Sequence, residues 1–497
     1  MFGLGSFLTF LGGLAAKVAA AVATLGTLGT FAVIAVGFAI GRSLKKQRQK
    51  QQQAAKGISG ILVTKQGTNA TIPVVYGERR LAGARVFIEA SGTDGDTKNA
   101  YFHLVESLCE GPIKGLKEIY FNDTLVATSS DDGATIDYSA GSTDFSSHAA
   151  TKFFDGSQTS RVSGTLLGQS ISSNWPSGAI GKELAYAYTV LKWDQDKFGS
   201  GVPTITYVIE GKKVPALNAE HDASLSYSAN PARCIYDYLI NPHYGKGIPK
   251  SLIDCDASSS SFKTVMDYCD ESVQKTTDAS AGNQTRYETD AVLDPDVSLL
   301  DNLEDLLQTA RAGILTGDKY KLIADKPEST SSLVTIDDDS IVGNITFQQA
   351  NKKTLANRLR CTFPNRAGTL NYQDDFAILE NSTLATSDGS TLSKEIVLEA
   401  VADKDRVNRI LNEELNQARQ SGLLEVTVDP SKLDLGVFDL VKFTNTTFGQ
   451  TNKIYRIMQT TLNADNTVTL NMREYDANVY WDNNKSIITN NKDDTDH

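Results

Sequence analysis

The chain has few of the residues that build catalytic and metal centres. It contains five histidines and five cysteines in 497 residues, with no HExxH run and no CxxC pair. The sequence therefore signals neither a zinc motif nor a disulfide framework, and we interpret the cysteines as buried free thiols of a protein folded in a reducing compartment. It also lacks a nucleophile elbow, a phosphate-binding loop and a dinucleotide fingerprint. We expect no metal site, no cofactor and no enzymatic activity.

Basic residues are also scarce outside the N-terminus. The formal net charge is −12, but residues 1–56, which we call the leader, hold seven basic residues and no acidic one. Residues 57–497 therefore carry a net charge of −19. Tight nucleic-acid binding needs clustered Lys and Arg that displace counterions. The acidity of residues 57–497, which we call the body, argues against such binding. It suits a channel through which DNA slides, and equally a surface that keeps the protein soluble.

Abundant carboxylates leave a hydrolase as an open alternative. Asp301, Glu304 and Asp305 lie on one predicted helix, and paired carboxylates serve glycosidases. Such pairs are common on solvated helix faces, and nothing in the sequence singles one out. The run 337–339 is Asp-Asp-Asp but lacks the spacing of a calcium loop, so we interpret it as a turn.

The leader contains the one long hydrophobic run. Residues 18–41 are uncharged over 24 positions, and about 20 apolar residues cross a bilayer as a helix. Because the charges follow the run, a cleaved signal peptide fits poorly. The run is either a membrane anchor or an apolar helix packed inside an assembly. The residues that would face the membrane or an assembly lumen are Val18, Val22, Leu25, Gly26, Phe31, Val33, Gly37, Phe38 and Gly41, and the basic flank is Arg42, Lys45, Lys46, Arg48 and Lys50.

The body reads as mainly β. Residues 102–126 combine β-branched and aromatic runs with turn residues, and Asn122-Asp123 predicts a two-residue hairpin turn. Apolar periodicity predicts helices near 230–241 and 261–272, between the strand-rich flanks, and another near 405–420, within the C-terminal flank. A further helix is predicted to begin after Asp294 as its cap, with Pro295 in the first turn.

The order of several motifs resembles one family. The phrase EGPIKGLKEIYFND at 110–123 is similar to a segment of the central tail hub proteins of long-tailed bacteriophages, the lambda-type tip or host-specificity family. The family's order is kept by further motifs. One comes before this phrase, IPVVYGERR from residue 72; the others come after it, NPARCIYDYLINPHYGKG from 230, YCD at 268–270 and a D.P element at 325–327. DLGVFDLVKFTN from 434 matches as well, with Phe438 where the family has Pro or Gly.

The resemblance implies a mainly β fold with an α+β module. We expect an apolar helix and a basic, Gln-rich linker over 1–56, and a first hub β-barrel over 57–229 that carries a looped insertion at about 128–182. A small α/β domain over 230–330 follows. A second hub β-barrel over 331–480 contains the amphipathic helix 405–420, and 481–497 is expected to be a disordered tail.

The resemblance also implies a structural part of the virion, at the distal end of the tail. The family's role predicts a homotrimer that joins the hexameric tail tube or distal tail protein to a tail fibre or receptor-binding protein. It also predicts contact with the tape measure protein, passing DNA and, through the leader, a host membrane. Because lambda-type proteins continue into further modules, we expect another protein to bind the receptor. The alternative is a membrane-anchored bacterial β-rich surface or secretion protein.

Overall fold

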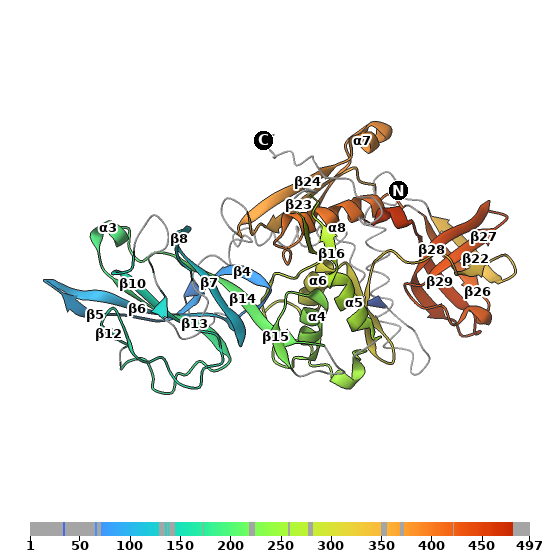
Figure 1. The fold of residues 1–497 in the computed structure, drawn as a ribbon. Coiled ribbons are helices and arrows are strands. Elements are labelled where there is room, and N and C mark those ends of the chain that lie inside the picture. The colour runs from blue at the N-terminus through green and yellow to red at the C-terminus, as the bar shows by residue number, and fades with distance from the viewer. Residues whose placement is uncertain are drawn as a thin grey trace.

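The computed structural model describes residues 71–480, with gaps at 129–134, 137, 139–144, 172, 218–223, 257–258, 277–281, 349–354, 368–371 and 421, and two short strands nearer the N-terminus, β1 (Val33–Ile34) and β2 (Lys65–Gln66). Three parts follow one another along an elongated molecule (Figure 1): a β unit, a central module with most of the helices, and a C-terminal β unit. The expected mainly β fold is confirmed.

The first β unit consists of two packed sheets. The larger has the strand order β2-β5-β6-β13-β10-β9, and the smaller runs β15-β14-β7-β8 with β4 also paired to β14. The bounds of these strands are β4 (Glu78–Ala82), β5 (Ala84–Asp94), β6 (Thr97–Glu110), β7 (Ile113–Phe121), β8 (Thr124–Thr128), β9 (Thr135–Ile136), β10 (Ala149–Phe154), β13 (Leu184–Lys192), β14 (Ile205–Pro215) and β15 (Leu225–Tyr227). Apolar side chains from both sheets fill one core between them.

The predicted turn between β7 and β8 is confirmed. Asn122 and Asp123 both have positive φ, 46° and 68°, and this left-handed backbone is what a tight two-residue hairpin requires. The insertion is less loop-like than expected. It contributes β9 (Thr135–Ile136) and β10 (Ala149–Phe154) to the larger sheet, and a small hairpin of β11 (Thr165–Leu166) and β12 (Gln169–Ser170). The sequence did not predict β10, because Ser- and Gly-rich segments lie on either side of it. Phe153 of β10 is fully buried.

The central module is built around three helices. Asn230 caps α4 (Pro231–Ile240) by accepting a hydrogen bond from Ala232 N (3.0 Å), and α5 (Ser261–Asp270) is capped by Ser260. The third helix, α6 (Leu299–Thr309), begins later than predicted. Ser298 is its cap, whereas Asp294 accepts from Asp296 N in a turn, so the prediction of Asp294 as the cap is wrong.

Short strands complete the centre of the module. β19 (Ala312–Thr316) and β20 (Tyr320–Ala324) form a hairpin after α6, and β1 pairs with β19. β3 (Val74–Tyr76) pairs with β18 (Ala291–Leu293), which ties the start of the body to the module. β16 (Ser272–Gln274) and β17 (Asn283–Thr285) form a second hairpin.

Residues 358–417 leave the expected second barrel and join the central module. β23 (Arg358–Pro364), β24 (Asp374–Glu380) and β25 (Ser393–Val397) form one sheet, with α7 (Ser382–Asp388) between β24 and β25, and α8 (Lys404–Gln417) follows. Their apolar side chains share one continuous core with α4, α5 and α6. This departs from the predicted division at residue 331, because α8 packs on β23 and β24, and its residues Val407, Ile410 and Leu411 belong to the core of the central module and not to that of a barrel.

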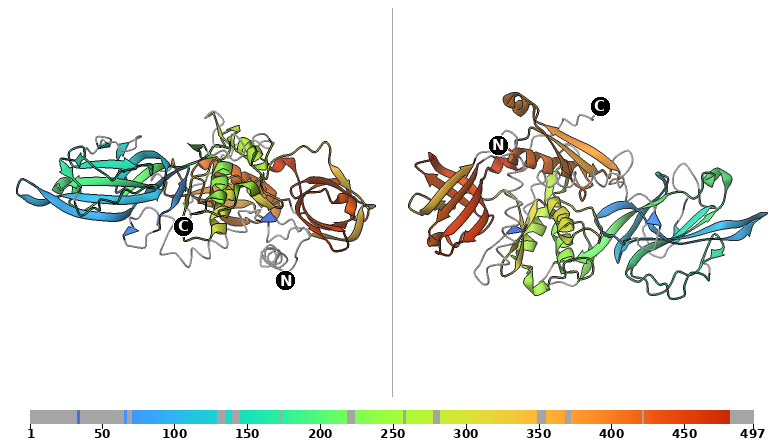
Figure 2. Two further views of the ribbon diagram at one scale, coloured as in Figure 1. Left: turned by 90° about the horizontal axis from the view of Figure 1, so that it is seen from below. Right: turned by 180° about the vertical axis from the view of Figure 1, so that it is seen from behind.

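The C-terminal β unit is a strongly curved six-stranded sheet, seen end-on as a ring in the left view of Figure 2. Its order is β21-β27-β28-β29-β26-β22, and its inward side chains form a separate core. The bounds are β21 (Val334–Ile336), β22 (Ile341–Gln348), β26 (Leu423–Val428), β27 (Leu440–Asn445), β28 (Gln450–Leu462) and β29 (Val468–Glu474), followed by the 3-10 helix η5 (Ala477–Val479).

Candidate functional site

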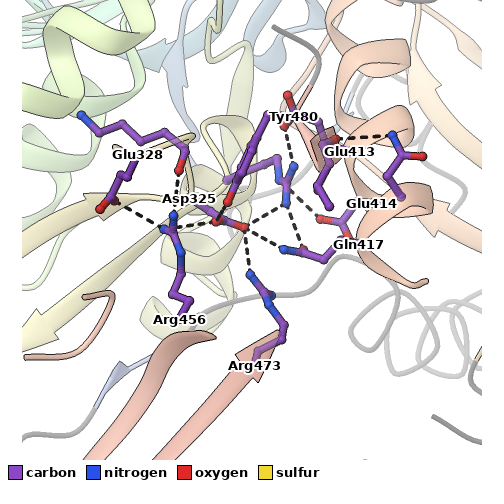
Figure 3. A network of polar contacts seen from close by, with 12 residues as sticks. Asp325, Glu328, Glu413, Glu414, Gln417, Arg456, Arg473 and Tyr480 are labelled. Atoms are coloured by element: carbon purple, nitrogen blue, oxygen red, sulfur yellow. Dashed lines mark hydrogen bonds and ion pairs between the residues drawn. The ribbon is translucent and has the colours of Figure 1, made fainter. Parts of the chain in front are cut away.

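A buried ion network joins the C-terminal β unit to the central module, and Asp325 is its centre (Figure 3). Asp325 follows β20, so the central module positions it. One carboxylate oxygen accepts from Tyr480 OH (2.6 Å) and lies 3.4 Å from Arg456 Nη1. The other accepts from Gln417 Nε2 (3.0 Å) and lies 3.5 Å from Arg473 Nη2. A single carboxylate thereby contacts α8, β28, β29 and the end of η5.

Arg311 connects this carboxylate to α8. It lies between α6 and β19, with φ of 49°, and its Nη2 donates to Asp325 (3.0 Å) and to Gln417 Oε1 (3.0 Å). Its Nη1 donates to Glu413, and its Nε lies 3.6 Å from Glu414. Because the guanidinium presents donors in a fixed plane, it holds three carboxylates and one amide in a set arrangement.

The opposite charges of the network are paired with one another in the protein interior, away from water. Burial alone would raise the pKa of Asp325, but Arg473, Arg456 and Arg311 outweigh burial and lower that pKa below its usual range. Burial raises the pKa of Glu414, and the attraction of Arg311 does not fully offset this. The two carboxylates thus differ: ionisation of Asp325 is favoured by the fold, and ionisation of Glu414 is opposed.

Aromatic rings cover the network on the side of the C-terminal unit. The Arg456 side chain is fully buried, and its guanidinium carbon lies 5.1 Å from the Tyr475 ring centroid and 5.5 Å from that of Phe438. Arg456 Nη2 also donates to the Lys326 carbonyl (2.8 Å). Phe438 has φ of 76°, a left-handed conformation that favours glycine, at the position where the family resemblance expects Pro or Gly.

A second polar junction joins the first β unit to the central module. Asp290 accepts from the Glu78 backbone N (2.9 Å) and from Arg366 Nη2 (2.8 Å), which come from β4 and from the loop after β23. Arg79 Nη1 donates to the carbonyls of Asp290 (3.1 Å) and Glu399 (2.8 Å). Nearby, Asp237 of α4 accepts from Tyr76 OH (2.6 Å) and Tyr244 OH (2.7 Å).

Gly77 permits this close approach. Its φ is 68°, and a Cβ at this position would lie 2.0 Å from the Thr289 carbonyl oxygen. From the sequence, the YG pair of the IPVVYG motif indicates only a turn. The structure shows that it also brings two units into backbone contact.

A cavity of about 360 Å³ opens beside the second junction. Two of its charged lining residues are already paired within the protein, because Arg366 binds Asp290 and Glu288 binds Arg406 at 2.9 Å. In the described part of the chain, no group of three metal-ligating side chains is found. The cavity therefore indicates no particular ligand.

Most of the residues predicted for a membrane or lumen helix lie outside the described residues, as does the whole basic flank. This holds for Val18, Val22, Leu25, Gly26, Phe31, Gly37, Phe38 and Gly41, and for Arg42, Lys45, Lys46, Arg48 and Lys50. Val33 is the exception, and it lies in strand β1 and not in a helix. Among the helices that the structure describes, none is sufficiently long and apolar to cross a membrane.

Sequence reasoning missed the ion network. Asp325 stands out in the sequence only within a D.P element, and Glu413 lies next to the apolar side of the predicted helix 405–420. Glu414 lies on that apolar side, three residues after Leu411 and seven after Val407, which is itself a signal of burial. A further signal was present in the strand KIYRIM, where Arg456 stands between the apolar residues Tyr455 and Ile457, and in the apolar context of Arg311.

Buried charge networks join the central module to the β unit on either side of it. A family model described as "Putative phage tail protein" matches residues 298–460, which span α6 to β28 and most of the ion network.

Two known proteins are similar over most of the chain. Baseplate hub protein pb3 of Escherichia phage T5 is 21% identical over 464 residues, covering 82% of this chain and 48% of pb3. The chain thus spans about half the length of that relative. A chain of the virion of a native gene transfer agent particle has the same fold, with a TM-score of 0.53 and 14% identity, covering 90% of this chain and 98% of that one. The expected resemblance to phage tail hub proteins and the expected place in the virion tail are confirmed.

Proposed function

We propose that this chain is the structural hub of a phage tail tip or baseplate and has no enzymatic activity. The observation that carries the proposal is the similarity to a baseplate hub protein along most of the chain. The buried junctions support it, because a hub must hold its domains in fixed relative positions under the load of attachment and ejection. A surface protein of a bacterial membrane would not account for the ordered motifs.

In this proposal three copies of the chain form a ring at the tail tip. Each subunit places two β units around the axis, so that a trimer offers six similar units to a hexameric tail tube or distal tail protein. The opposite face of the ring binds components with threefold symmetry, such as a tail fibre or receptor-binding protein. The tape measure protein ends at the ring, and DNA passes through it. The net charge of −19 over residues 57–497 repels DNA and keeps it from sticking.

The leader takes part in host membrane passage in this proposal. Exposed in water, an apolar helix of 24 residues would leave over about 1,000 Å² of apolar surface, which costs roughly 25 kcal/mol at about 25 cal/mol per Å². It therefore buries itself against its copies, against another tail protein or in lipid. We propose that the three leaders lie near the threefold axis until host contact.

The stoichiometry tests the hub role, and a deletion tests the leader. Native mass spectrometry of purified tail tips should give three copies of this chain, and any other number contradicts the trimer. Particles that lack residues 1–41 should assemble but deliver DNA poorly. Normal delivery by those particles would remove the membrane role and leave the hub role standing.

A further inference from the structure

The leader is attached to the central module through a strand. β1 adds to the outer edge of the β19–β20 hairpin, with Val33 opposite Leu315 and Ile34 opposite Ile314 in antiparallel register. Strand addition to an open sheet edge satisfies backbone donors and acceptors that would otherwise face solvent. The pairing therefore holds the apolar run at a defined place on its own subunit.

A strand at this place and a membrane-crossing helix exclude each other. A helix over all 24 residues of 18–41 would be about 36 Å long, enough for a hydrocarbon core of about 30 Å. With Val33 and Ile34 in β1, the longest uninterrupted piece is 18–32, which would be about 22 Å as a helix. Pairing with β19 thus prevents the spanning form.

An exposed apolar patch lies in the same part of the module. Val297, Leu299 and Leu300, at the start of α6, are 42%, 41% and 43% exposed, which is high for large apolar side chains. α6 leads directly into β19 and is about 16 Å long. Seven or more uncharged residues of the run flank β1 on each side, and seven extended residues reach over about 23 Å. Either flank is therefore long enough to reach the patch.

Charge also favours this occupant. Asp294, Asp296 and Asp301 lie at or beside the patch, whereas the leader has seven basic residues and no acidic one. We propose that the edge of β19 and the patch Val297–Leu299–Leu300 form a docking surface for the leader of the same chain, and that docking locks the leader out of its membrane-spanning form. This inference deepens the proposed function and rests on it for the release step.

Disulfide trapping tests the docking directly. Paired residues in adjacent antiparallel strands have Cα atoms about 4.5–5.5 Å apart, within disulfide range. Full-length protein with Val33→Cys and Leu315→Cys should form a cross-link at monomer mass under mild oxidation. Lys321 lies opposite Leu315 on β20, two strands from β1, at about 10 Å. Val33→Cys with Lys321→Cys is therefore the matched control and should not cross-link.

The native cysteines do not confuse this readout, because all five are buried. If the variant that carries both Val33→Cys and Leu315→Cys forms no bridge, the docking is overturned. A cross-link at dimer mass would also overturn it as stated, because the leader would then come from a second copy.

The patch is tested by polarity at constant charge. Leu299→Asn with Leu300→Asn should slow the cross-linking at least about threefold, because neutral polar side chains remove the apolar contact and leave the charge of the patch unchanged. Val342→Asn, at a residue 55% exposed on the C-terminal unit, is the control and should leave the rate unchanged. Equal rates in the two variants would remove the patch from the docking surface.

The lock has a functional readout. Oxidised particles with the Val33→Cys and Leu315→Cys pair should deliver DNA at least about tenfold less well, because the bridged leader cannot reach its spanning form, and a reductant should restore delivery. If the bridge forms but delivery is unchanged, the docking stands and the membrane role in the proposed function fails. If no bridge forms, the docking fails and the hub role is untouched.

Discussion

Two isosteric substitutions in the ion network should have different effects on stability. In Asp325→Asn the amide loses the charge that faces Arg456 and Arg473, which stay buried. Removing one partner of a buried ion pair typically costs about 3–5 kcal/mol. At about 2–4 °C per kcal/mol for a unit of this size, the melting temperature should fall on the order of 10 °C. Glu414→Gln removes a carboxylate whose ionisation is opposed by burial, so stability at neutral pH should be unchanged or higher.

The pH dependence of the two variants follows from the direction of each pKa shift. The folded pKa of Asp325 is below its unfolded value of about 3.9, so its stabilisation is present above about pH 4 and is lost as the pH falls through the folded pKa. The folded pKa of Glu414 is above its unfolded value of about 4.3, so its favourable contribution is present below about pH 4.3 and is lost as the pH rises through the folded pKa.

Thermal unfolding of the full chain, followed by tryptophan fluorescence and circular dichroism from about pH 4 to about pH 8, measures both effects. The deficit of Asp325→Asn should persist across this range, and any gain of Glu414→Gln should shrink toward the acidic end. A melting temperature of Asp325→Asn within about 1 °C of the wild type would refute the reasoning. An equal loss in both variants would show that packing, and not charge balance, governs the junction.

Three further predictions concern other parts of the chain. Phe438→Gly should destabilise less than Phe438→Ala, by about 1 kcal/mol in denaturant titration, because both lose the buried ring but only glycine relieves the left-handed backbone; the reverse order would exclude strain at this position. Protein lacking the leader should not bind DNA in gel-shift titration, and submicromolar salt-sensitive binding would contradict the acidic-channel argument. Zymography on peptidoglycan should show no clearing, and a cleared band that disappears in Glu304→Gln would make the protein a hydrolase.

Local features were predictable from the sequence because their causes are local. The Asn122-Asp123 turn and the helix that begins at Pro231 follow from neighbouring residues alone. The same local reasoning placed the start of α6 at Asp294, because Asp followed by Pro is a common helix start. It failed there because Ser298 provides a competing cap further along, where its hydroxyl accepts from Asp301 N.

The junctions were not predictable because their partners are distant in sequence. Arg311 and Glu413 are 102 residues apart, and Asp325 and Tyr480 are 155 apart. Apart from Arg311, whose sequence neighbours are apolar, each of these residues alone resembles one on a solvated surface. These residues are buried together only because α8 packs between the hairpin β19–β20 and the C-terminal unit. The same long-range packing places residues 358–417 in the central module, beyond the predicted division at residue 331.

Cryo-electron microscopy of the virion tail tip tests the hub role most directly. We expect three copies of this chain in a ring around the channel, with both β units of each subunit facing the tail tube and the Asp325 network intact between the central module and the C-terminal unit. A different copy number, or C-terminal units separated from their central modules, would contradict it.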